Sequence, residues 1–145
     1  MYKIYFFSPL IAWGLSGSIK FLVNSIKARK YAFNEIGYGG FPSSHMAIVS
    51  SGLSTYVLIE GFDSSFAIGL SLTLIVMLDA LNLRKKIGEH AVYLNKLKKN
   101  NQNLRGLRNL REKMGHNFME VIGGCAIGFL SSFFAIKLSK MILII

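Results

Sequence analysis

Three short segments of the chain combine residue types that bind or transfer phosphate. They are 39–45 (Gly-Gly-Phe-Pro-Ser-Ser-His), 79–84, which begins with Asp79 and ends with Arg84, and 115–120, which holds His116 and Glu120. Each lies where a strongly apolar stretch meets a polar, basic one. Two histidines, several cations and a carboxylate therefore gather at membrane boundaries. This arrangement suits a site for a lipid phosphate better than a passive membrane anchor.

The segment Pro42-Ser43-Ser44-His45 predicts the start of a helix, because proline fits the first turn and Ser43 or Ser44 can cap it. The free N–H groups and partial positive charge of a helix N-terminus favour a bound phosphate. Gly39-Gly40, just before it, lets the backbone approach a ligand closely. His45 would then stand beside that ligand. An ordinary capped helix with an incidental histidine would carry the same residues.

His116 and Glu120 are four residues apart at a second predicted helix start, just after Gly115, and so share one helical face. A carboxylate there can accept one imidazole N–H, fix the tautomer and leave the other nitrogen as a nucleophile or base. A charge near a membrane boundary needs a partner, which His116 would provide. A purely structural His–Glu pair has the same spacing.

The remaining candidates are Asp79, Arg84 and Lys20. Asp79 ends an apolar run and needs a partner or a cavity. Arg84 offers a bidentate fork to phosphate, although Arg84-Lys85-Lys86 is also what a plain topology signal looks like. Lys20 lies in an apolar helix, where it either extends to the interface or points into a polar site between helices.

The composition combines two properties that rarely occur together in a soluble protein. Hydrophobic residues make up 52% of the 145 residues, yet 17 Lys+Arg against 7 Asp+Glu give a net charge of +10. The mean hydropathy is +0.42. Membrane helices with basic loops explain both properties. Nucleic-acid binding is disfavoured, because the cations flank apolar spans and are not interleaved with exposed aromatics.

The apolar pattern predicts an all-α, integral-membrane helical bundle that forms one domain over residues 1–145. About four transmembrane spans are expected, with a basic, partly helical insertion at 82–117 between the third and the fourth. The expected spans are 4–23, 43–60, 65–81 and 118–140.

The positive charges predict the orientation of the bundle in a cell membrane. The insertion at 82–117 contains ten Lys and Arg against Glu89 and Glu112, whereas the turn at 60–64 has two acids and no cation. The positive-inside rule places the insertion, and with it all three phosphate-type segments, on the cytoplasmic side. Within the insertion, Leu104, Leu107, Leu110 and Met114 recur at helical spacing and predict a basic amphipathic helix. Such a helix either lies on an anionic leaflet or packs on the bundle.

Taken together, these segments resemble the type-2 phosphatidic acid phosphatase superfamily, which includes vanadium-dependent haloperoxidases, and most closely its divergent branch of small membrane proteins. The superfamily's Pro-Ser-Gly-His motif corresponds to Pro42-Ser43-Ser44-His45. Its final motif, a His and an Asp separated by three residues, corresponds to His116 and Glu120. Its opening motif, in which six residues separate a Lys from Arg-Pro, corresponds to Lys20 and Lys27. Here Lys27 replaces the Arg and Ala28 replaces the Pro. No Ser-Arg precedes His116 at the usual distance, and Arg84 is preferred to Arg111 for that role.

The resemblance implies a two-step phosphoryl transfer on a lipid phosphate, with no metal or cofactor and with vanadate acting only as a phosphate mimic. His116 would attack phosphorus and form a phosphohistidine, Glu120 would orient it, and His45 would protonate the departing oxygen. The groups implied in holding the phosphate are Lys20, Lys27, Ser43, Ser44 and Arg84, with Asp79, Gly40 and Gly115 supporting the site.

Two other readings remain open from the sequence alone. A non-catalytic membrane protein could bind anionic lipid or a protein partner through the basic insertion. Gly124 and Gly128 form a GxxxG step, which packs helices closely inside one bundle or across a homodimer. A metal site built from His45, His90 and His116 is disfavoured, because no two of these histidines have a close ligand spacing.

Overall fold

The structure is a computed structural model that describes residues 3–29, 31 and 40–142. Its helices are α1 (Lys3–Ala28), α2 (Ser44–Glu60), α3 (Ser64–Leu78), α4 (Arg84–Asn100) and α5 (Phe118–Ile142). A π-helical turn, Asp79–Leu83, joins α3 to α4, and a short 3-10 turn, Gln102–Leu104, follows α4. The described residues contain no strand, which confirms the predicted all-α class.

Three helical stretches are long and apolar enough to cross a membrane: Ile4–Ala28, Ser64–Asn100 and Phe118–Met141. They confirm a bundle of membrane helices. The remaining helix, α2, has 17 residues, so it is about 26 Å long against a hydrocarbon core of about 30 Å. A total of four spans therefore stays a prediction.

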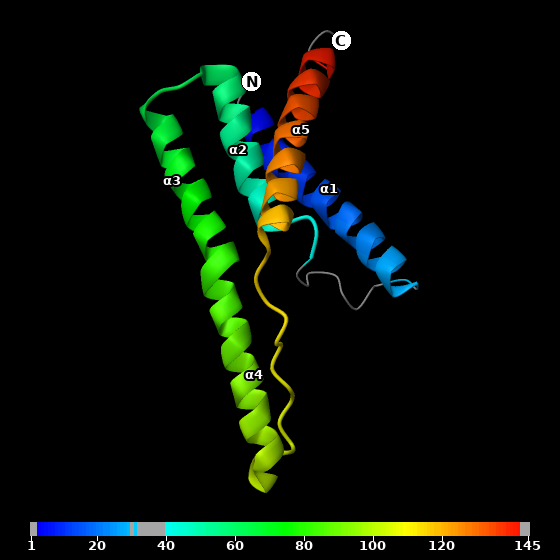
Figure 1. The fold of residues 1–145 in the computed structure, drawn as a ribbon. Helices are drawn as coiled ribbons and strands as arrows, with labels where there is room; N and C mark the ends of the chain where they lie inside the picture. The colour runs from blue at the N-terminus through cyan, green and yellow to red at the C-terminus, as the bar shows by residue number, and fades with distance from the viewer. Residues whose placement is uncertain (1–2, 30, 32–39, 143–145) are drawn as a thin grey trace.

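Helix α2 is the centre of the bundle, because it contacts α1, α3 and α5. Figure 1 shows α2 between α3 and α5, with α1 crossing the pair obliquely. The inward face of α1 is a series with a spacing of four, in which Ile4, Ser8, Ala12, Ser16, Lys20 and Asn24 are all buried. This regular series carries Lys20 into the bundle rather than out to lipid.

The bundle is built on small polar side chains and exposes its large apolar ones. Ser8, Ser51, Thr55 and Ser132 are fully buried, whereas Phe6 is 74% exposed. The Thr55 hydroxyl donates to the Ser8 Oγ at 2.6 Å, and the Ser132 hydroxyl donates to the Ser51 carbonyl at 2.8 Å. This distribution fits a lipid environment, where close backbone approach and interhelical hydrogen bonds stabilise helix packing and large side chains face hydrocarbon.

Helices α5 and α2 approach each other closely. A Cβ added at Gly124 would collide with the Ser43 carbonyl, and one added at Gly128 would collide with Ser50 Oγ and the Ala47 carbonyl. The GxxxG step is therefore used for packing inside the bundle, one of its two expected roles.

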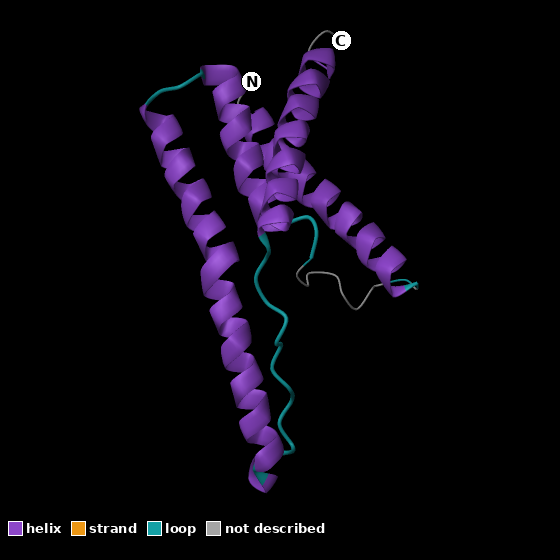
Figure 2. Ribbon diagram, in the orientation of Figure 1, coloured by secondary structure: helices purple, strands orange, loops and turns teal. Residues whose placement is uncertain are grey.

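Helices α3 and α4 and the turn between them form one continuous helix of 37 residues, roughly 55 Å long. The chain then returns along α4 in extended form to the start of α5 (Figure 2). Asn95 fastens this return segment, since its side chain accepts from the Leu110 N–H and donates to the Leu110 carbonyl, both at 2.8 Å. At Gly88 the return segment comes so close that a Cβ would collide with the Glu112 carbonyl.

The expected amphipathic helix through Leu104, Leu107, Leu110 and Met114 is wrong, because residues 108–114 have no helical structure. Leu104, Leu107 and Leu110 are exposed, so a helix here would bury no apolar face, and packing of that face is what normally stabilises a short helix. The backbone groups of Leu110 bond to Asn95 instead. The helical first part of the insertion is confirmed by α4.

We expect Gly128→Ala to destabilise the bundle by about 1–3 kcal/mol, because the added methyl overpacks the α2–α5 contact. The matched control is Gly17→Ala in α1, where a Cβ meets nothing within 4 Å. This control should be neutral or stabilising by up to about 1 kcal/mol, from helix propensity alone. Unfolding of the purified protein in detergent, followed by circular dichroism, measures both. Equal effects of the two substitutions would contradict the packing described.

We expect Asn95→Leu to release the return segment while the transmembrane helices stay folded, because it removes three hydrogen bonds from a buried amide. Amide hydrogen exchange of residues 105–114 should speed up, whereas that of α2 and α5 should not change. Asn103→Leu, at an exposed position, is the control. Unchanged protection in the Asn95 variant would show that other contacts hold the segment.

Candidate functional site

The starts of α2 and α5 are joined by a direct backbone hydrogen bond. The Ser43 N–H donates to the Glu120 carbonyl at 2.8 Å. His45 lies in the first turn of α2 and is exposed, and His116 lies two residues before α5 and is 6% exposed. Two histidines 71 positions apart in the chain are thus held at the same end of the bundle, close enough for their charges to interact.

His116 is oriented by Glu120. The ring Nδ1 lies 2.8 Å from Glu120 Oε2, which also accepts the Asn117 N–H at 3.2 Å. Asn117 Oδ1 in turn accepts the Glu120 N–H at 2.8 Å, so the two side chains form a reciprocal cap on α5. An ionised carboxylate only accepts hydrogen bonds, so Nδ1 carries the proton and Nε2 keeps its lone pair.

The π-helical turn Asp79–Leu83 shapes the second part of the site. The Arg84 N–H bonds to the Asp79 carbonyl, five residues back, rather than to that of Ala80 as in an α-helix. The wider turn places side chains five apart on one face, so that Arg84 Nε donates to Asp79 Oδ2 at 2.6 Å. The Ala80 carbonyl accepts the His116 N–H at 2.9 Å. One local irregularity therefore positions Arg84 and anchors His116.

Arg84 also connects this turn to α2. Its Nη1 lies 3.3 Å from His45 Nε2, and since a guanidinium only donates, Nε2 is the acceptor. His45 therefore carries its proton on Nδ1 in this state. The contacts to Asp79 and His45 use two of the five guanidinium N–H donors, so the group retains capacity for an anion.

Lys20 is a further basic group at this end of the bundle. It is 8% exposed, and it interacts electrostatically with His45, His116 and Glu120. One turn further along α1, buried Asn24 approaches Gly40, whose ideal Cβ would lie 3.4 Å from Asn24 Oδ1. Lys20 therefore points between the helices and does not extend to the membrane interface.

The other candidates are Lys27, Ser43 and Ser44. Lys27 is exposed near the end of α1, which leads away from the bundle (Figure 1). Ser43 is fully buried, and its Oγ accepts the Met46 N–H at 3.4 Å, so its hydroxyl serves as the cap of α2. Ser44 is the first residue of α2 and is half-buried.

The two glycines that border the cluster both adopt positive φ angles. Gly40 has φ 127°, and Gly115 has φ 82°. At Gly115 an added Cβ would also lie 2.9 Å from the Lys85 backbone nitrogen, so only glycine fits there. Gly39 lies outside the described residues.

The electrostatics keep His116 neutral near pH 7. Burial of the ring lowers the pKa of His116 below its usual value of 6.5 and outweighs the Glu120 carboxylate, which raises it. The positive charges of Lys20 and Arg84 lower it further. A neutral imidazole with one nitrogen fixed and the other free, beside two cations, is suited to attack an anionic phosphorus centre.

Several contacts at the site were not expected from the sequence. The Asn117–Glu120 cap has a readable signal, because Asn-x-x-Glu before an apolar run is a capping pattern. Asn24 and the π-helical turn have no such signal.

Among the residues that the structure describes, no three His, Cys, Asp or Glu side chains are grouped to hold a metal ion. His90 is exposed on α4.

Comparison with known proteins places the chain in a family. The chain is 41% identical over 93 residues to an uncharacterized membrane protein, YuiD, of Bacillus subtilis (strain 168). The match covers 62% of this chain and 58% of that protein, so the chain spans less than two thirds of its relative. No solved structure is a significant match. The profile of the Divergent PAP2 family matches residues 1–131, and the chain belongs to that family.

Proposed function

We propose that the protein is an integral-membrane phosphatase or phosphotransferase that acts on a lipid phosphate through a phosphohistidine, at the cytoplasmic face of the cell membrane. The observation that carries the proposal is the pairing of His116 Nδ1 with Glu120 at 2.8 Å, next to His45 and Arg84, which lie 3.3 Å apart. Membership of the Divergent PAP2 family supports the same class of chemistry.

In the proposed first step, His116 Nε2 attacks phosphorus and the bond from phosphorus to the lipid oxygen breaks. His45, protonated on both ring nitrogens while the phosphate anion is bound, donates a proton to that oxygen, so the lipid leaves as an alcohol and His45 returns to its neutral form. Glu120 holds Nδ1 and stabilises the positive ring. In the second step, His45 takes a proton from water, the water oxygen attacks phosphorus, and the P–N bond breaks to return His116 and release phosphate. An alcohol in place of water gives phosphotransfer.

Three groups would hold the phosphate oxygens during both steps. Arg84 turns its remaining donors to the anion while Asp79 fixes its orientation, and Lys20 supplies a second charge. The free backbone N–H of Ser44, at the start of α2, offers a third contact. Cations and N–H dipoles of this kind offset the charge of a phosphoryl-transfer transition state. Lys27 would act at longer range, from the exposed end of α1.

The proposed side of the membrane is inferred from the distribution of charged residues. The cluster lies at the end of the bundle from which α4 and the return segment extend (Figure 1), and these carry ten Lys and Arg. The opposite end holds the acidic turn with Glu60 and Asp63. The positive-inside rule assigns the cluster to the cytoplasmic leaflet.

We expect His116→Ala to lower kcat for phosphate release from dioleoyl phosphatidic acid by about a thousandfold or more, because it removes the nucleophile. The same variant should form no acid-labile phosphoprotein with a radiolabelled substrate. His90→Ala, an exposed histidine on α4, is the matched control and should retain both signals. Full turnover by the His116 variant would eliminate the proposed nucleophile. Tight lipid binding without turnover by the unsubstituted protein would favour a non-catalytic role.

We expect the acid limb of the kcat/KM profile to lie below pH 6.5, because the pKa of His116 is lowered and only the neutral ring attacks. Glu120→Gln removes a charge that favours the protonated ring, so it should move the pKa of His116 to a still lower pH. Histidine NMR shifts, with the His116 signal assigned from the His116→Ala spectrum, measure this pKa directly. A pKa above 6.5 in the unsubstituted protein would contradict the burial described.

A further inference from the structure

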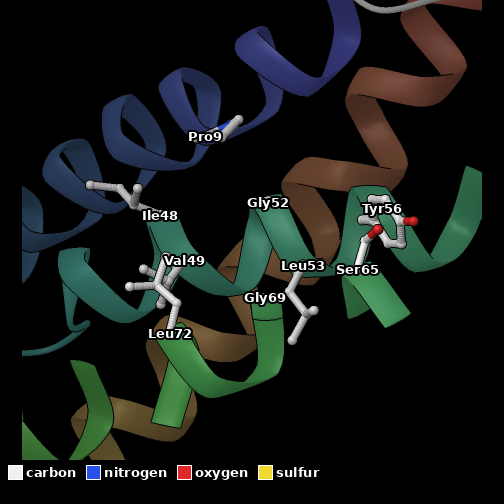
Figure 3. A pocket seen from close by; sticks show the side chains of 9 residues that line it. All are labelled: Pro9, Ile48, Val49, Gly52, Leu53, Tyr56, Ser65, Gly69 and Leu72. Atoms are coloured by element: carbon white, nitrogen blue, oxygen red, sulfur yellow. The ribbon is translucent and has the colours of Figure 1, made fainter. Parts of the chain in front are cut away.

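An apolar groove of about 350 Å³ opens between α1, α2 and α3 (Figure 3). Its walls are Pro9 from α1, one face of α2 and one face of α3, and the absence of a side chain at Gly52 leaves room beside Pro9. The full lining is Pro9, Ile48, Val49, Gly52, Leu53, Tyr56, Ser65, Gly69 and Leu72. None of these residues belongs to the proposed phosphate site.

The two helix faces that line the groove lead directly to that site. On α2, Tyr56, Gly52 and Val49 follow one another at spacings of four and three, and the next residue in this series is His45. On α3, Ser65, Gly69 and Leu72 follow the same spacing, and the series continues through Val76 to Asp79. Gly52 follows His45 by seven positions, and Leu72 precedes Asp79 by seven positions. Each separation corresponds to roughly 10 Å along the helix.

The far end of the groove is polar. The Tyr56 hydroxyl donates to Asp63 Oδ2 at 2.6 Å, and Asp63 caps α3 through the Ser65 N–H at 2.8 Å. The groove is therefore apolar along its length and polar at its far end, at the Tyr56–Asp63 pair. At its near end the lining stops at Ile48, Val49 and Leu72, and His45 and Asp79 lie further along the same helix faces. Its α3 wall belongs to Ser64–Asn100, one of the stretches apolar enough to cross a membrane, so lipid chains are the medium expected around the groove.

We propose that this groove holds the hydrocarbon chain of the lipid phosphate substrate while its phosphate reaches His45, Arg84 and His116. The inference rests on the proposed function and adds a substrate class, namely phosphate monoesters with a hydrocarbon chain long enough to extend about 10 Å from the phosphorus. The hydrocarbon chain of such a substrate stays among the membrane helices while its phosphate reaches the charged end of the bundle. The groove then selects for chain length at a distance from the chemistry.

The test fills the groove without disturbing the site. Gly52→Leu suits this purpose, because a Cβ at Gly52 meets only Pro9 Cγ, at 3.9 Å, whereas one at Gly69 would collide with Leu53. Gly17→Leu, on α1 where a Cβ meets nothing within 4 Å, is the matched control. The full chain in lipid nanodiscs is assayed with oleyl phosphate and with butyl phosphate, whose chain is too short to reach Gly52.

We expect Gly52→Leu to raise the KM for oleyl phosphate about tenfold and to leave kcat/KM for butyl phosphate unchanged. The Gly17→Leu control should alter neither. Equal losses on both substrates, or no change on either, would overturn the groove assignment. Hydrolysis of neither ester by the unsubstituted protein would refute the proposed function instead.

A second measurement decides the groove assignment without any turnover. An oleyl phosphate analogue with a diazirine near the chain end is photoactivated in nanodiscs, and the labelled peptides are identified by mass spectrometry. We expect labelling of residues 48–56 and 65–72, reduced at least severalfold in Gly52→Leu. Equal labelling by the corresponding alcohol, which lacks the phosphate, would show a bystander bilayer lipid, and labelling spread over all helices would show no defined site. Either result would overturn the proposal.

Discussion

The close contact between α2 and α5 sets the positions of the candidate site residues. Gly124 and Gly128 bring the two backbones together, and at the end of this contact the Ser43 N–H bonds to the Glu120 carbonyl. Larger residues at either glycine would push α5 away from α2. Because His45 follows Ser43 by two positions and His116 precedes Glu120 by four, separation of the helices would also separate the two imidazoles. Packing of the helices and the geometry of the candidate site thus depend on the same close approach.

The long helix formed by α3 and α4 supplies what these two helix starts lack. Its π-helical turn pairs Arg84 with Asp79 and leaves the Ala80 carbonyl to anchor His116. The chain travels out along α4 and returns beside it, and Asn95 holds the returning segment in register. The basic insertion is therefore a structural connection between Arg84 at its start and His116 at its end. By the positive-inside rule, its charges also predict the orientation of the protein in the membrane.

Much of the fold follows from short-range patterns. Apolar stretches of about 20 residues predicted the membrane helices, and Pro42-Ser43-Ser44 predicted the start of α2. The spacing of four predicted that His116 and Glu120 share one helical face, and their side chains do meet there. The failure at 104–114 has a physical cause, since helical periodicity stabilises a helix only where its apolar face is buried, and here the leucines are exposed. Neither the π-helical turn nor the contact of Arg84 with His45 has a sequence signature, because both depend on how separate helices meet.

An experimental structure of the protein with bound orthovanadate would show whether His116, His45 and Arg84 form one phosphate site. We expect vanadium bonded to His116 Nε2, with Arg84 and Lys20 on its equatorial oxygens and His45 at the apical oxygen opposite the histidine. Vanadate bound elsewhere on the basic insertion, or a His116 ring whose Nε2 faces away from His45 and Arg84, would contradict a shared phosphate site.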